Sequence, residues 1–271
     1  MTPVLAFDIE TVPDTSGLRR VHGLPEDMSD RDVAELAFQR RRQVSGNDFL
    51  ALHLHRVVAI ACTLRDENQF AVWSLGHRDE TEGDLLRRFF DGLERYTPQL
   101  VSWNGGGFDL PVLHYRALVH GVKARRYWDL GDEDREFRFN NYISRYHMRH
   151  LDLMDVLSSY QPRAVAPLDD IARMLGFPGK LGMDGSKVWA AFQNGELDAI
   201  RSYCETDAVN TYLVFLRFQL MRGMLNADQY ECELDVVHAA LSRSTAYHWQ
   251  EFIGAWQRSA PAAPDLTPNA S

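Results

Sequence analysis

The sequence predicts an α/β fold with a mixed central sheet flanked by helices. Short apolar runs such as Val4–Phe7 are typical of buried strands. The segment 83–96 instead carries its apolar residues at helical spacing. Segments of the two kinds follow one another along the chain, and this alternation favours an α/β fold over an all-α or all-β one.

Strands are expected where short segments combine apolar residues with flanking turn residues: 4–7, 56–64, 69–75, 99–103 and 150–157, the last of which enters a turn. Helices are expected where apolar residues recur every three or four positions: 30–43, 83–96, 108–120, 168–175, 196–222 and about 228–256. Ser29 is the predicted N-cap of the first helix, and Gly121 and Gly176 end two others.

The composition along the chain suggests one main domain with additions. Residues 14–50 are polar and rich in charge, so we expect an insertion between the first two strands within a domain over 1–222. A C-terminal helical extension is expected over 223–258. The proline- and alanine-containing tail over 259–271 is expected to be disordered.

Overall composition narrows the class of protein. The 271 residues include 45% hydrophobic side chains, but no apolar run approaches the roughly 20 residues that span a bilayer. The three cysteines are far apart, and the start lacks a signal peptide, so we expect a cytoplasmic protein that binds no membrane. A net charge of −9 argues against tight nonspecific binding of duplexes. This charge is compatible with catalysis on a nucleic-acid end, because bound cations would neutralise the negative charge of clustered carboxylates.

Two acidic motifs follow predicted strands. Asp8 and Glu10 alternate at a strand end and therefore point to the same side, although two solvated acids would give the same pattern. Asp109 ends the segment Asn104–Asp109, whose three glycines permit close backbone approaches. A flexible turn with Asp109 at a helix start is the alternative for that segment.

A third motif lies on a predicted helix, where Tyr203 and Asp207 are one turn apart on the same face. Four carboxylates without histidine or cysteine companions suit hard cations such as Mg²⁺ or Mn²⁺. Two such ions can bind a phosphodiester on both sides of its phosphorus. Tyr203, with an ordinary pKa of about 10, is better suited to orienting a water than to deprotonating it. The predicted chemistry is phosphodiester hydrolysis with two divalent metal ions.

These motifs resemble the three exonuclease motifs of the DEDD superfamily, the DnaQ-like 3′–5′ exonucleases. Over residues 1–222 the chain is similar to the proofreading domain of family B DNA polymerases, and specifically to stand-alone polymerase-B-like exonucleases of bacteria. The resemblance implies a ribonuclease-H-like fold and Tyr203 as the water-orienting catalytic residue. It implies as catalytic metal ligands Asp8, Glu10, Asp109 and Asp207. It further places at the substrate Ile9, Thr11, Asn104, Gly105 and Phe108.

The resemblance also indicates a subtype and a substrate. The histidine-bearing branch has its general base five residues before the last aspartate, where this chain has Ser202, so the tyrosine branch (DEDDy) is expected. The expected substrate is the 3′ end of single-stranded DNA, with release of nucleoside 5′-monophosphates. Degradation of RNA stays open, because the motifs do not specify contacts to the 2′-hydroxyl. A non-catalytic nucleic-acid-binding protein on the same fold is the other alternative.

Weaker candidates lie outside these motifs. Arg125–Trp128 mixes charge with aromatic rings and could bind single-stranded nucleic acid, although a packed loop is the alternative. Lys180 and Lys187 belong to a glycine-rich segment that is either near a phosphate backbone or solvated. Asp152 and Asp155 could form a second acidic layer or cap the following turn.

Overall fold

The computed structural model describes residues 2–67 and 69–258, and within them the strands form one five-stranded mixed sheet. The strands are β1 (Val4–Pro13), β2 (His55–Arg65), β3 (Phe70–Ser74), β4 (Gln99–Ser102) and β5 (His150–Asp152). Their order across the sheet is β3-β2-β1-β4-β5. β1 is antiparallel to β2 and parallel to β4, which places it at the centre of the sheet.

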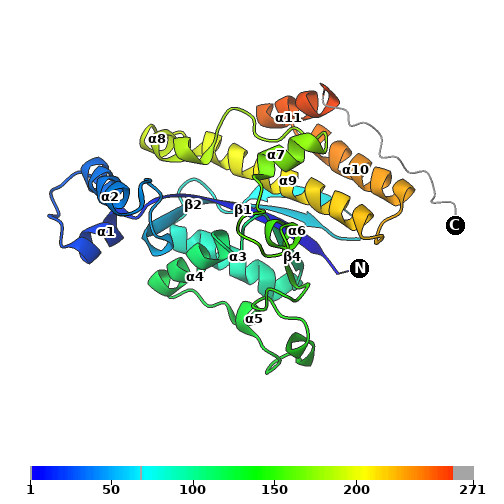
Figure 1. The fold of residues 1–271 in the computed structure, drawn as a ribbon, viewed down its shortest axis with the longest axis horizontal. Helices are drawn as coiled ribbons and strands as arrows, with labels where there is room; N and C mark the ends of the chain where they lie inside the picture. Colours follow the sequence, from blue (N-terminus) through cyan, green and yellow to red (C-terminus); the bar gives the residue numbers. More distant parts are fainter. Residues whose placement is uncertain (1, 68, 259–271) are drawn as a thin grey trace.

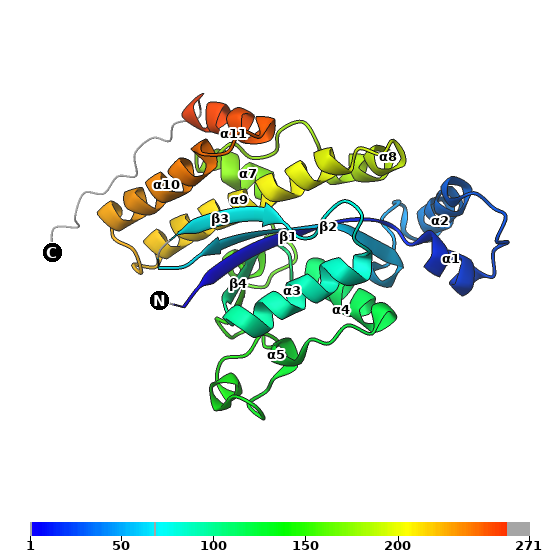
Figure 2. The ribbon, with the colours of Figure 1, turned by 180° about the vertical axis from the view of Figure 1, so that it is seen from behind.

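Helices cover both faces of this sheet, as Figures 1 and 2 show. They are α1 (Thr15–His22), α2 (Asp30–Ser45), α3 (Glu82–Tyr96), α4 (Asp109–His120), α5 (Arg125–Trp128), α6 (Leu153–Leu157), α7 (Leu168–Met174), α8 (Val188–Gln193), α9 (Leu197–Met221), α10 (Ala227–Ser242) and α11 (Tyr247–Arg258). Short 3₁₀ turns lie at Leu52–Leu54, Arg135–Arg138 and Gly185–Lys187. The predicted α/β, ribonuclease-H-like class is confirmed. None of the described helices has the length and apolar character needed to cross a membrane.

Alternation along β1 decides which side chains face which helices. Phe7 and Ile9 enter the core formed with α3 and α4, whereas Ala6 enters the core formed with α7 and α9. Because neighbouring strand residues point to opposite faces, Asp8 and Glu10 lie on the α9 side. The β1–β2 register shifts between Glu10 and Thr11, so an irregularity directly follows the acidic pair.

The segment 14–50 forms a small helical subdomain at one end of the molecule (Figure 1). Its helices α1 and α2 pack together through the buried side chains of Leu18, Val33 and Leu50. Ser29 caps α2 as expected, its hydroxyl accepting the Asp32 amide. The predicted insertion is therefore a packed helical unit between β1 and β2.

Several of the expected elements need correction. The single helix expected at 228–256 is two helices, because α10 ends at Ser242 and α11 begins at Tyr247; this break lets Trp249 and Phe252 pack into the α9 core. The strand expected over 150–157 stops at Asp152, whose side chain caps α6. Helices α1, α5 and α8 were not expected at all. The predicted tail over 259–271 lies outside the described residues.

Candidate active site

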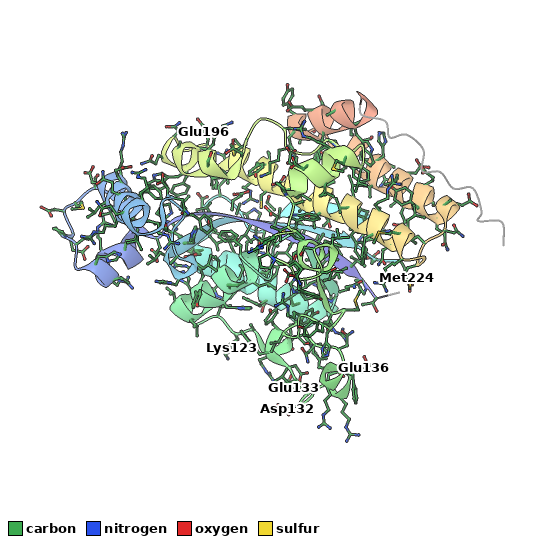
Figure 3. The ribbon with its side chains drawn as sticks, in the orientation of Figure 1. Lys123, Asp132, Glu133, Glu136, Glu196 and Met224 are labelled. Atoms are coloured by element: carbon green, nitrogen blue, oxygen red, sulfur yellow. The ribbon has the colours of Figure 1, made fainter. Side chains whose placement is uncertain are left out.

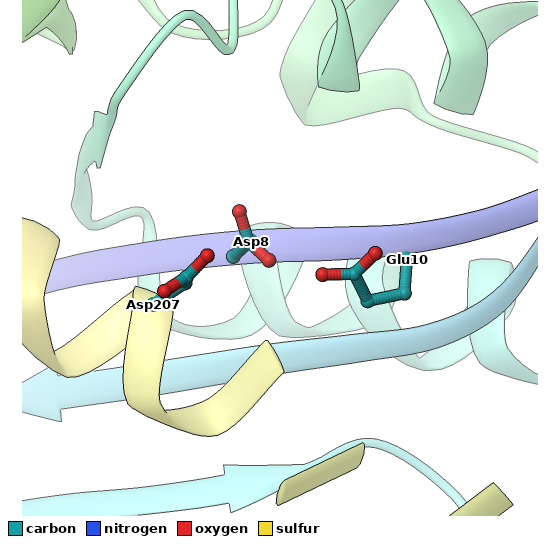
Figure 4. A group of neighbouring side chains, drawn as sticks. All are labelled: Asp8, Glu10 and Asp207. Carbon is teal, nitrogen blue, oxygen red and sulfur yellow. The ribbon is translucent and has the colours of Figure 1, made fainter. Parts of the chain in front are cut away.

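Three carboxylates from distant parts of the chain meet at the centre of the sheet. Asp8 and Glu10 project from β1 and Asp207 from α9, as Figure 4 shows. Each offers one oxygen, and these three oxygens lie within 4.8 Å of one another. α9 packs across β1 and β2. This packing brings Asp207 of the helix to the two acidic residues of β1.

Hydrogen bonds between backbone and side chains fix the surroundings of the cluster. The Cys204 thiol donates to the Asp8 carbonyl (3.2 Å) and ties α9 to β1. The Ile9 amide donates to Asp109 Oδ1 (3.2 Å) and ties β1 to the start of α4. Asp109 is not among the three carboxylates that meet within 4.8 Å, but it lines the same cavity of about 720 Å³. We call this space the acidic cavity; its lining includes Asp8, Glu10, Asp109, Lys180, Tyr203 and Asp207.

Burial makes these carboxylates hard to ionise. Burial, reinforced by the neighbouring carboxylates, raises the pKa of Asp8 and of Glu10 well above their ordinary values. Burial raises the pKa of Asp109 to about 7. It raises the pKa of Asp207 to about 6, although nearby Lys180 and Tyr203 lower that pKa. Without a compensating positive charge, the cavity therefore retains protons near neutral pH.

Two oxygens of the cluster have no hydrogen-bond partner among the described residues: Asp8 Oδ2 and Asp207 Oδ1, both buried. Leaving such a group unpaired costs about 1–3 kcal/mol, and more when it is charged. A hard divalent cation binds carboxylate oxygens of this kind and lowers their pKa. The donor set and its orphaned oxygens therefore fit Mg²⁺ or Mn²⁺.

Tyr203 and Lys180 complete the wall of the acidic cavity. The Tyr203 side chain is buried, and this burial raises its pKa far above the ordinary value, so the phenol keeps its proton. Lys180 Nζ lies 3.8 Å from Asp207 Oδ2 and 5.3 Å from the centre of the Tyr203 ring. The sequence made Lys180 only a weak candidate, because its loop carries no motif spacing; its glycine neighbours were the sole signal.

The glycine-rich loop before Asp109 is held by Asp152. The Asp152 carboxylate accepts the amides of Asn104 (3.0 Å) and Gly106 (2.8 Å) and also caps α6. The capping interpretation of Asp152 is confirmed, with this second task added. Gly105 is buried, and a Cβ there would clash with the side chain of Ser102. Close packing therefore explains this glycine, and its contact with substrate stays a prediction.

The other residues expected at the substrate divide between two cavities. Ile9, Asn104 and Phe108 line the acidic cavity together with the carboxylates. Thr11 lines an adjoining cavity instead, and its hydroxyl is within hydrogen-bond distance of His55 Nδ1 (2.8 Å).

The basic and aromatic candidate Arg125–Trp128 forms α5. Three of its side chains contact other residues of the protein. Tyr127 is buried in the core, Arg125 pairs with Glu133, and Arg126 lies 3.5 Å from Asp134. Figure 3 shows the charged side chains of this part of the chain at the outer edge of the molecule. These contacts favour the packed interpretation. Lys187 is likewise paired, with Asp184 at 3.1 Å.

An α/β sheet of this order, with an acidic cluster on its central strand, defines the class as a ribonuclease-H-like nuclease fold. Residues 47–256 match the family described as predicted 3′-5′ exonucleases related to the exonuclease domain of PolB. This chain belongs to that family. The match begins after Asp8 and Glu10, and the structure brings these two residues to Asp207.

Proteins that this chain is similar to include three DNA polymerases. A catalytic subunit of DNA polymerase epsilon from Arabidopsis thaliana is 26% identical over 147 residues, which cover 51% of this chain and 6% of the polymerase. A DNA polymerase of Archaeoglobus fulgidus is 24% identical over 136 residues, covering 49% of this chain and 17% of that protein. The corresponding epsilon polymerase of Dictyostelium discoideum is 26% identical over 140 residues, covering 51% of this chain and 6% of that protein. The chain thus corresponds to a small part of each polymerase.

Proposed function

We propose that the protein is a metal-dependent 3′–5′ exonuclease that hydrolyses phosphodiester bonds at the 3′ end of single-stranded DNA and releases nucleoside 5′-monophosphates. The observation that carries this proposal is the meeting of Asp8, Glu10 and Asp207 within 4.8 Å. Within the described part of the chain, Asp8 and Asp207 each leave a buried oxygen unpaired, beside a protonated Tyr203.

The carboxylates are proposed to hold two divalent cations, Mg²⁺ or Mn²⁺. Asp8, Glu10 and Asp207 would supply ligand oxygens, and Asp109, which lines the same cavity, would add another. Bound cations would supply Lewis acidity to a water and to the departing 3′ oxygen. The Ile9 amide, by donating to Asp109 Oδ1, would hold this carboxylate beside Asp8 and Glu10.

The remaining residues of the cavity position the reactants. The protonated Tyr203 phenol can donate to or accept from a water beside Asp207, so it would orient the nucleophile. Lys180, whose Nζ lies 3.8 Å from Asp207 Oδ2, would bring a positive charge to a phosphate bound in the cavity. Burial of this constellation restricts bulk water, which strengthens each of these electrostatic contacts.

DNA is the proposed substrate because the named relatives are DNA polymerases and the family is related to a polymerase exonuclease domain. Tyr203 and the serine at 202 support the tyrosine subtype of the proposed mechanism.

The test incubates purified protein with 5′-labelled single-stranded DNA or RNA, in Mg²⁺, Mn²⁺ or EDTA. We expect stepwise shortening of the DNA from its 3′ end in either metal and none in EDTA. Faster shortening of RNA would reassign the substrate. Absence of cleavage of both polymers by folded, metal-loaded protein would refute the enzymatic function and leave a binding protein.

A further inference from the structure

A second cavity adjoins the acidic one and is partly built by the 14–50 insertion. Its volume is about 550 Å³, within the roughly 300–1,000 Å³ range of small-molecule sites. We call it the insertion hollow; its lining includes Glu10, Thr11, Phe49, His55, Phe108 and Trp189. Glu10 and Phe108 line both cavities, so the hollow lies directly beside the metal-binding carboxylates.

We propose that Phe49 stacks on the base of the 3′-terminal nucleotide, so that the insertion is part of the substrate site. This inference rests on the proposed function and adds to it a residue from outside the three motifs. Phe49 is 54% exposed, and its ring centre lies 5.6 Å from that of Phe108 and 5.2 Å from that of His55. An aromatic ring this exposed, beside two further rings, offers a flat apolar face to a ligand.

The backbone that carries the Phe49 ring is held in place before any ligand arrives. Its carbonyl accepts Arg41 Nε (2.7 Å), and its amide donates to Asn47 Oδ1 (3.1 Å). The next residue, Leu50, is buried in the core of the insertion. A ring on a fixed backbone has less conformational entropy to lose on binding, which favours affinity.

The insertion itself is fixed to the main domain. Arg116 on α4 forms buried ion pairs with Asp14 Oδ2 (2.5 Å) and with Glu82 Oε2 (2.6 Å), and the Asp14 amide donates to the Leu54 carbonyl (2.8 Å). These contacts hold Asp14, at the start of the insertion, against α4 and against Leu54, just before β2. The insertion that carries Phe49 is therefore anchored to the main domain at its start.

A nucleobase is the occupant that this lining suits. Every base has a π-face, and stacking on aromatic side chains binds unpaired bases with little sequence preference. A phosphate is a poorer occupant, because the hollow contains the Glu10 carboxylate and its wall is largely apolar. With the scissile phosphate at the carboxylates, the base of the same nucleotide would lie against Phe49 and Phe108.

The first experiment removes the Phe49 ring by mutation and, separately, the 3′-terminal base by using an abasic oligonucleotide. We expect Phe49→Ala to lower kcat/KM about tenfold on single-stranded DNA with a normal 3′ end, mainly through KM. On the same oligonucleotide with an abasic 3′-terminal residue, Phe49→Ala should change little, because the stacking partner is already absent. Phe49→Trp should retain activity on the normal strand. The matched control is Phe139→Ala, which removes an 82% exposed phenylalanine from the 122–148 segment and should match wild type on both.

An equal loss on the normal and abasic strands would show that Phe49 acts only through the structure and would overturn the inference. No loss on either strand would overturn it as well. These outcomes leave the proposed exonuclease function intact, because wild-type cleavage is measured alongside.

A binding measurement decides the inference even if the wild type cleaves nothing. In EDTA, a strand with 2-aminopurine at its 3′ end should lose fluorescence on binding wild type, since stacking quenches this base. The quenching should be lost with Phe49→Ala and kept with Phe139→Ala. Bound strand without quenching, or quenching that Phe49→Ala leaves unchanged, would contradict the base site.

Discussion

Asp207 and Tyr203 lie one helical turn apart on α9 but have different tasks in the proposed mechanism. Asp207 would help Asp8 and Glu10 to hold the cations, whereas Tyr203 would orient a water through its hydroxyl. We expect Asp207→Ala to abolish cleavage and Tyr203→Phe to lower kcat by up to about a hundredfold, the size of a positioning effect. Single-turnover rates in Mn²⁺ measure both. If Tyr203→Phe cleaves as fast as wild type, the water-orienting role is wrong.

Lys180 is the residue whose role depends most on the tertiary structure. Its ammonium lies 3.8 Å from Asp207, whereas Lys187 in the same loop pairs with Asp184. Lys180→Met keeps the apolar stem and removes the charge, and we expect kcat/KM to fall about tenfold. Lys187→Met is the matched control and should match wild type. Equal kcat/KM values for the two variants would show that the Lys180 charge has no role in the site.

At the scale of elements, the buried cluster around Arg116 joins the insertion to the main domain. Arg116→Met would leave Asp14 and Glu82 without their buried partner, so we expect the free energy of unfolding to fall by about 3–5 kcal/mol. The control Arg88→Met breaks an ion pair with Glu80 at the surface, where solvent screens the charges, and should lower the stability far less. Denaturant unfolding of both variants measures the difference. Similar losses of unfolding free energy in the two variants would show that the buried cluster stabilises the protein no more than the surface pair does.

Elements with a strong local signal were predicted well. The capped helix α2, the apolar periodicity of α3 and the glycine-ended α4 follow from the sequence, because short-range contacts decide them. The break between α10 and α11 depends on packing against α9, which no local pattern reports. The same holds for the site. Its carboxylates followed from three motifs, whereas Lys180 and Phe49 reach the site only through the folding of loops that carry no motif.

At the scale of the whole molecule, the acidic cavity opposes folding when no cation is bound. Its carboxylates have folded-state pKa values above their ordinary ones, with Asp207 at about 6 and Asp109 at about 7. Groups with a raised folded-state pKa stabilise the protein at low pH, and this stability is lost as pH rises through those values. Metal-free protein should therefore lose thermal stability between about pH 4 and pH 7 through these groups.

Divalent cations should reverse this trend. At a hundredfold excess over its dissociation constant, a bound ion adds about 2.7 kcal/mol, or roughly 5–10 °C in Tm for a chain of this size. Thermal unfolding in EDTA and in Mn²⁺ at pH 6 and pH 8 measures the effect, which we expect to be larger at pH 8. Asp207→Ala should show little of it. A Tm that does not change with Mn²⁺ at either pH would contradict metal binding by these residues.

The central claim is that the carboxylate cluster cleaves DNA from its 3′ end. Its most direct test compares wild type with Asp207→Ala, purified identically, on single-stranded DNA labelled at the 5′ end, in Mn²⁺. The account predicts a ladder that shortens one nucleotide at a time for wild type, with nucleoside 5′-monophosphates as products, and intact DNA for the variant. Equal cleavage by the two proteins, or products that begin at the 5′ end, would contradict it.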